Sequence, residues 1–151
     1  MHGTIFILKE KSEWLNEYEV FEAMNIEWPG IDYVNDDLSS EEASKRIKFF
    51  ADDPSYPEFQ GKSIVITSKS EHDRNQARKR KIRELSDRIV KEDAGEYLLR
   101  SLLEGEPYGT YICYSEGYPE EKYQHVLTLD TFLRTAEEGI YDIVGVMDYH
   151  C

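Results

Sequence analysis

Cys113 and His125 are the two side chains in this sequence whose types and spacing favour nucleophilic catalysis. Residues 117–120 have the composition of a turn, so a hairpin of symmetric register would place position 113 opposite position 125. A histidine in that place would stabilise the reactive thiolate. However, no third residue would orient the histidine, and no glycine-rich segment follows Cys113. A buried cysteine beside a structural histidine is commoner, so we expect no catalytic residue, and a small Cys113/His125 enzyme is the last of three hypotheses.

The sequence also lacks the patterns of a metal or phosphate site. The histidines are scattered without ligand spacing, at His2, His72, His125 and His150. His150 and Cys151 would supply a single pair of ligands, and Glu71-His72-Asp73 would point in different directions on a helix. The turn at 105–109 contains a proline and does not resemble a phosphate-binding loop. We therefore expect no metal and no cofactor.

Half of the lysines and arginines lie between residues 69 and 91, where nine bases and four acids give a local net charge of +5. Because the whole chain carries −13, the rest of it carries −18. The densest part has six bases and no acid, and these are candidate polyanion-binding residues: Arg74, Arg78, Lys79, Arg80, Lys81 and Arg83. An exposed helix of this kind would bind nucleic-acid phosphates without reading bases. Alternatively, the bases pair with acidic residues of the same chain or of a second copy.

Carboxylates are concentrated in the first third of the chain. The candidate partner-binding residues are Glu13, Glu17, Asp36, Asp37, Glu41, Glu42, Asp52 and Asp53. If spaced like phosphates, they would occupy the basic groove of a nucleic-acid-binding protein, as in decoy proteins and immunity-type inhibitors. The plainer interpretation is that a sequence pI near 4.7 simply favours solubility.

Composition and length predict one packed domain over residues 1–151. The chain is 40% hydrophobic and 13% aromatic, which is typical of a folded core. Its two cysteines are too few for a disulfide framework and indicate a reducing compartment. The apolar run 5–8 ends at Lys9, too short for a signal peptide or a membrane span. We expect a soluble cytoplasmic protein that makes no membrane contact.

The first half of the chain reads as strand, helix, helix, strand. The strands are expected at 4–8 and 63–67, from their β-branched and aromatic residues. Ser12 is the expected cap of the first helix, with a buried stripe of Trp14, Tyr18, Phe21 and Met24. Ser39 and Glu42 have the spacing of a capping box for the second helix, whose stripe is Ala43, Ile47 and Phe50.

A long helical stretch, from about 70 to 103, opens the second half. Ala77 is the single apolar residue between 70 and 81, so we expect this first part to project into solvent and the stripe Ile82, Leu85 and Ile89 to be buried. Strands are expected at 108–114, 123–129 and 141–147. A short helix should begin at Asp130, carry Phe132, Leu133 and Ala136, and end at Gly139.

These elements predict an α+β fold, with a mixed or antiparallel sheet of about five strands, helices packed on it and one long, partly basic helix. The favoured function is that of an acidic protein, not an enzyme, that inhibits or sequesters a basic, nucleic-acid-binding partner. The second hypothesis is an accessory protein that binds nucleic acid directly through residues 74–83. Self-association is left open.

Overall fold

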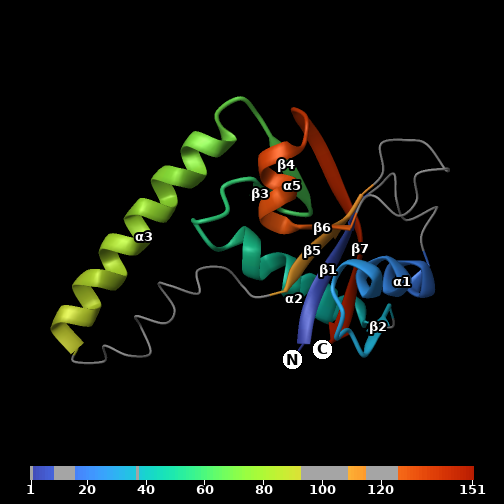
Figure 1. Ribbon diagram of the computed structural model, residues 1–151. Coiled ribbons are helices and arrows are strands. Elements are labelled where there is room, and N and C mark those ends of the chain that lie inside the picture. Colours follow the sequence, from blue (N-terminus) through green and yellow to red (C-terminus); the bar gives the residue numbers. More distant parts are fainter. Residues whose placement is uncertain (1, 9–15, 37, 93–108, 115–125) are drawn as a thin grey trace.

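The computed structural model describes residues 2–8, 16–36, 38–92, 109–114 and 126–151, and in them it has four helices and seven strands (Figure 1). In chain order these are β1 (His2–Leu8), α1 (Glu17–Glu27), β2 (Tyr33–Asn35), α2 (Ser40–Ala51), β3 (Phe59–Gln60), β4 (Ser63–Ile66), α3 (Ser70–Glu92), β5 (Thr110–Cys113), β6 (Val126–Thr128), α5 (Leu129–Thr135) and β7 (Gly139–His150). The α+β class is confirmed. None of the described helices is both long and apolar enough to cross a membrane.

The strands form one mixed sheet. Its order is β3-β4-β7-β1-β5-β6, and β2 pairs with β7 outside this order. β1 runs parallel to β5, and the other described pairs are antiparallel. The expected number of about five strands was too low. The two missing strands, β2 and β3, have three and two residues, which is too few for an alternating pattern to show in the sequence.

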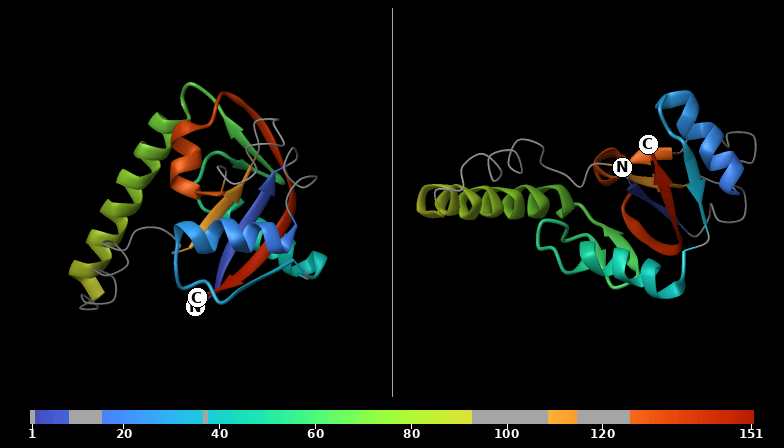
Figure 2. Two further views of the ribbon diagram at one scale, coloured as in Figure 1. Left: turned by 45° about the vertical axis from the view of Figure 1, so that its right-hand side comes forward. Right: turned by 90° about the horizontal axis from the view of Figure 1, so that it is seen from below.

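β1 is buried on both faces, which explains its continuous apolar sequence. Phe6 and Leu8 join a core with residues of α2 and α5, whereas Ile5 and Ile7 join a second core with residues of α1. Figure 2 shows α1 on one side of the sheet and α2 on the other. The two cores together fix β1 as the central strand.

Helix starts are set by capping boxes. The box predicted for α2 is confirmed, because Ser39 Oγ accepts from the Glu42 N–H and Glu42 Oε2 accepts from the Ser39 N–H, each at 3.2 Å. Its stripe is also confirmed, with Ile47 and Phe50 buried. Helix α1 also begins with a capping box: Asn16 Oδ1 accepts from the Glu19 N–H, and Glu19 Oε2 accepts from the Asn16 N–H.

The predicted stripe of the first helix was wrong at Tyr18, which is 69% exposed. The buried residues of α1 are Val20, Ala23 and Met24, spaced i, i+3, i+4. Ser12, the expected cap, and Trp14 lie outside the described residues. The prediction is confirmed at Met24, and Phe21 packs partly buried against the same core, so the stripe was wrong at Tyr18 and missed Val20 and Ala23.

The predicted division of the long helix is reversed in α3. Its first part packs on the body, with Arg74 only 2% exposed and Ala77 buried. Arg74 donates to the Glu58 carboxylate, which is also buried. The second part extends away from the sheet (Figure 1), and there Ile82 is half exposed and Val90 is 85% exposed. A buried charge pair, rather than an apolar stripe, therefore attaches this helix.

We predict that Arg74→Met lowers the free energy of unfolding by about 3–5 kcal/mol, because it leaves the Glu58 carboxylate buried without its cation. Urea unfolding followed by circular dichroism measures the change. The matched control is Arg80→Met, at an exposed position of the same helix, which should shift the value by less than about 0.5 kcal/mol. Equal losses in the two variants would show that the pair does not hold α3.

Candidate functional site

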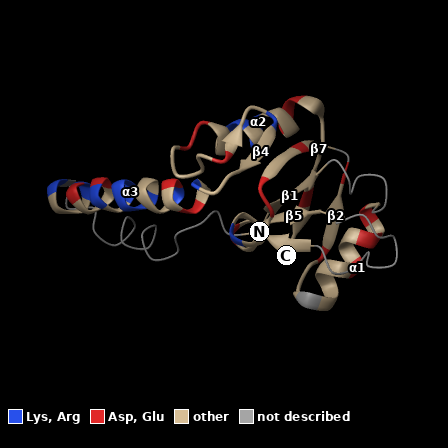
Figure 3. Ribbon diagram, turned by 90° about the horizontal axis from the view of Figure 1, so that it is seen from above, with Lys and Arg blue, Asp and Glu red and all other residues tan. Residues whose placement is uncertain are grey.

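The structure brings two of the predicted acidic residues into one groove. Glu17 begins α1 and Asp36 follows β2, and both line a groove of about 630 Å³ between these elements. The described residues of the lining are Asn16, Glu17, Tyr18, Phe21, Asp32, Tyr33, Val34 and Asp36. These residues include three carboxylates and no lysine or arginine, so we call the hollow the acidic groove. Figure 3 shows α1 beside it carrying acidic residues without basic ones.

The groove exists because β2 is short and pairs at the very end of β7. Val34 lies opposite Tyr149 and is buried against α1 residues, while its neighbour Tyr33 pairs with His150 and remains 44% exposed. The Tyr33 ring is stacked on the His150 imidazole, with centroids 5.6 Å apart and planes 6° apart. Alternation along β2 therefore fixes which side chains are buried and which remain accessible.

Local hydrogen bonds hold the carboxylates in place. The Asn16 capping box puts Glu17 in the first turn of α1, where the helix dipole favours a negative charge. Asp32 Oδ2 lies 2.9 Å from His150 Nδ1. Carboxylates beside accessible aromatic rings bind guanidinium and ammonium groups, by charge-assisted hydrogen bonds and by contact of the cation with the ring face. The groove therefore has the chemistry of a site for arginine or lysine side chains.

Four other acidic candidates lie at the two ends of α2 and are not among the described lining residues of the acidic groove. At the helix start, Glu41 pairs with Lys45 at 2.7 Å. Hydrogen bonds from Ser39 lower the pKa of Glu42 below its usual value. The interactions of these two carboxylates therefore stabilise the start of α2. Glu13 and Asp37 lie outside the described residues.

At the end of α2, Asp52 is the C-cap residue and Asp53 has partners of its own. Burial would raise the pKa of Asp53, but hydrogen bonds from Ser55 and Lys81 outweigh it, and the pKa is lowered. The predicted acidic residues that the structure describes therefore lie in a groove and at the two ends of one helix.

Three of the six basic candidates on α3 pair with the body of the same chain. Arg74 binds Glu58, Arg78 lies 3.1 Å from Asp130, and Lys81 lies 3.1 Å from Asp53. Intramolecular pairing, the alternative considered from the sequence, is therefore confirmed for these three. The other candidates are exposed: Lys79, Arg80 and Arg83. The expectation that the whole basic segment is exposed was wrong, because a helix presents its bases to several sides.

The proposed pairing of Cys113 with His125 used the wrong register. Cys113 pairs with Val126 and Ile112 with Leu127, one residue away from the symmetric hairpin. Cys113 is fully buried in the core beneath α1. His125 lies outside the described residues. Among the residues that are described, no three His, Cys, Asp or Glu side chains are grouped to hold a metal ion.

Sequence reasoning missed the aromatic half of the acidic groove. Tyr18 was assigned to the core, and Tyr33 to no element. The available signal was local: each tyrosine directly follows an acidic residue, Glu17 or Asp32. Their convergence depends on the pairing of β2 with β7, which joins residues more than a hundred positions apart. Comparisons with family models, with curated proteins and with solved structures found no match to this chain.

We predict that one of the two thiols reacts rapidly with DTNB in the native protein and that both react in urea. Cys151 is exposed, whereas Cys113 has no accessible surface. The Cys151→Ser variant should lose the rapid reaction, and its remaining thiol, Cys113, should react in urea. A rapid phase that survives in this variant would restore Cys113 as a candidate nucleophile.

Proposed function

We propose that this protein binds a basic partner, itself a nucleic-acid-binding protein, and inhibits it by holding a cationic segment in the acidic groove. The observation that carries the proposal is the lining of the groove, where Glu17, Asp32 and Asp36 lie beside Tyr18 and Tyr33. Among the residues that the structure describes in this lining, none is a lysine or an arginine.

Arginine fits this lining better than lysine does. Its guanidinium is flat, can donate two parallel hydrogen bonds to one carboxylate and can stack on an aromatic face. Tyr18 offers the most accessible ring, and Glu17 precedes it on the same turn of α1. Arginines that contact nucleic-acid phosphates in the partner would be occupied by carboxylates instead.

The distribution of carboxylates favours insertion of a short segment over imitation of a long nucleic-acid backbone. Three acidic residues at the ends of α2 have partners within the chain and are not among the described lining residues of the groove: Glu41 binds Lys45, Glu42 binds Ser39 and Asp53 binds Lys81. Long-range attraction still involves the whole molecule, whose net charge is −13. Association should therefore be fast and should weaken as salt rises.

The test measures binding of a short fluorescein-labelled oligoarginine peptide by fluorescence anisotropy. We predict that the double variant Glu17→Gln/Asp36→Asn weakens binding about tenfold, since two exposed ion pairs together contribute about 1.4 kcal/mol. The loss should shrink at high salt, where exposed charges are screened. Tyr18→Ala should weaken binding of the arginine peptide more than binding of a lysine peptide of equal length.

The control changes the same net charge elsewhere. Glu137 and Glu138 are exposed, precede β7 and do not line the groove. Binding by Glu137→Gln/Glu138→Gln should stay within about twofold of the parent protein, the size expected for distant surface charges. An equal loss in both double variants would mean that total charge, not the groove, binds the peptide, and the proposal would fail.

The partner itself is sought by affinity capture from a host lysate, with and without nuclease, and elution along a salt gradient. The parent protein and the Glu17→Gln/Asp36→Asn variant serve as paired baits. A basic protein that resists nuclease, elutes with salt and is absent from the variant bait would support the proposal. Nucleic acid on both baits would favour the second hypothesis.

A second candidate function, binding of nucleic acid, uses the exposed bases of α3. Lys79, Arg80 and Arg83 lie on a helix whose far part extends away from the sheet, as both views in Figure 2 show. A projecting basic helix can approach phosphates while the acidic body stays at a distance. The pairing of Arg74, Arg78 and Lys81 with the body leaves these three bases as the candidates.

For this candidate we predict that Lys79→Ala/Arg80→Ala/Arg83→Ala abolishes binding of a labelled single-stranded oligonucleotide at low salt. The reason is that three phosphate contacts would be lost. Binding of the oligoarginine peptide should not weaken. If oligonucleotide binding is absent in the parent protein, or unchanged in the variant, α3 does not bind nucleic acid.

A further inference from the structure

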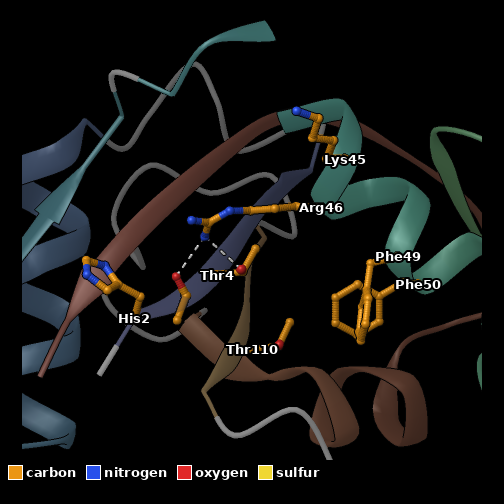
Figure 4. A pocket seen from close by; sticks show the side chains of 8 residues that line it. His2, Thr4, Lys45, Arg46, Phe49, Phe50 and Thr110 are labelled. Atoms are coloured by element: carbon orange, nitrogen blue, oxygen red, sulfur yellow. Dashed lines mark hydrogen bonds between the residues drawn. The ribbon is translucent and has the colours of Figure 1, made fainter. Parts of the chain in front are cut away.

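A second hollow, beside α2, has the opposite chemistry. It is a cavity of about 310 Å³, lined by β1, α2 and β5 residues, and we call it the cationic cavity. Its polar side chains include His2, Lys45 and Arg46, and none of the lining residues that the structure describes is a carboxylate. Figure 4 shows Arg46 reaching from α2 towards Thr4, with His2 to one side and Phe49 and Phe50 to the other.

The guanidinium of Arg46 is held rigidly. Its Nη1 donates to the Gly3 carbonyl oxygen at 3.0 Å and to Thr4 Oγ1 at 2.9 Å, and its Nη2 donates to Asp148 Oδ1 at 2.8 Å. Asp148 is buried, and its other oxygen lies 2.9 Å from His2 Nδ1. Because Thr4 Oγ1 accepts from Arg46, its own proton remains to be donated to a ligand. The guanidinium, whose charge Asp148 balances, and the Thr4 hydroxyl together form a preorganised set of hydrogen-bond donors for an anion.

Lys45 adds a second, adjustable cation. It is paired with Glu41 one turn earlier, but both side chains are more than two-thirds exposed, and such pairs contribute little. The ammonium can therefore turn to an anion in the cavity at small cost. Lys45 and Phe49 are four residues apart on α2 and share one face of the helix.

The apolar end of the cavity has an accessible ring. Phe49 is 60% exposed, although its ring packs edge-on against Phe50, with centroids 5.3 Å apart. Phe50 is buried in the core and holds this wall in place. An exposed phenyl group on a fixed support is a surface on which a flat ring can stack.

We propose that the cationic cavity binds a nucleotide carrying a terminal phosphate, with the phosphate at Lys45 and Arg46 and the base on Phe49. Its volume is at the small end of ligand pockets, which suits one nucleotide rather than several. A free nucleotide and the phosphorylated end of a nucleic-acid strand present the same phosphate and ring, and the experiment below distinguishes these two sources. This site shares no lining residue with the acidic groove and does not depend on the function proposed for it.

The test is a titration of the full chain with AMP, adenosine and inorganic phosphate, followed by calorimetry and by amide chemical shifts. AMP should bind at least tenfold more tightly than adenosine or phosphate alone and should shift the amides of β1 and α2. Lys45→Ala and Phe49→Ala should each weaken AMP binding about five- to tenfold. Arg46 is left unchanged because it ties β1 to β7.

Two controls separate this site from general effects. Lys48→Ala, at an exposed position of the same helix outside the cavity lining, should bind AMP like the parent protein. Glu17→Gln/Asp36→Asn should also bind AMP normally, so failure of one proposal does not affect the other. Circular dichroism confirms that each variant is folded.

A second titration distinguishes the two sources of the nucleotide. A short oligonucleotide is compared with and without a 5′-phosphate. Tighter binding of the phosphorylated strand than of AMP indicates a strand end, and the reverse indicates a free nucleotide. Absence of AMP binding, or equal binding of AMP and phosphate that Phe49→Ala does not change, would overturn the proposal.

Discussion

The pairing of β7 with three other strands is the constraint on which the rest of the structure depends. Residues 139–142 pair with β4, residues 143–150 with β1 and residues 148–150 with β2. The last residues of β7 therefore lie between β1 and β2, and they supply Asp148 to Arg46 and His150 to Asp32. Because side chains alternate along a strand, a slip of one residue would turn both groups to the opposite face. Both proposed sites thus depend on one register.

Charge is sorted inside this molecule rather than spread evenly over it. The inward bases of α3 are neutralised by Glu58, Asp130 and Asp53, so the first half of the helix packs on the body without an apolar stripe. Burial of Arg74 requires a carboxylate partner, because an unpaired buried charge would be very costly. In the described lining of the acidic groove, by contrast, there are three carboxylates and no lysine or arginine. A local excess of carboxylates of this kind favours binding of a basic ligand.

The sequence was sufficient for elements whose signal is local. The α2 capping box and the apolar run of β1 were predicted correctly, because three to eight neighbouring residues carry each pattern. It was insufficient where the partner is remote. Nothing near Arg74 indicates that Glu58 will accept its charge, and the composition of the turn after Cys113 left the hairpin register one residue wrong. For the acidic groove, Glu17 and Asp36 were named from the sequence as acidic candidates, whereas the places of the tyrosines depend on tertiary packing.

The two hollows have opposite charge and yet meet through one set of polar contacts. Asp32 bonds His150, the His150 ring meets the His2 ring at a centroid distance of 5.0 Å, and His2 bonds the carboxylate that also holds Arg46. Asp32 is bound by His150, and Asp148 is bound by both His2 and Arg46, so specific hydrogen bonds fix the polar groups between the two hollows. Arg46 therefore keeps a fixed place in the cationic cavity while Asp32 keeps one in the acidic groove. Preorganisation of both sites follows from contacts that β7 makes without any ligand.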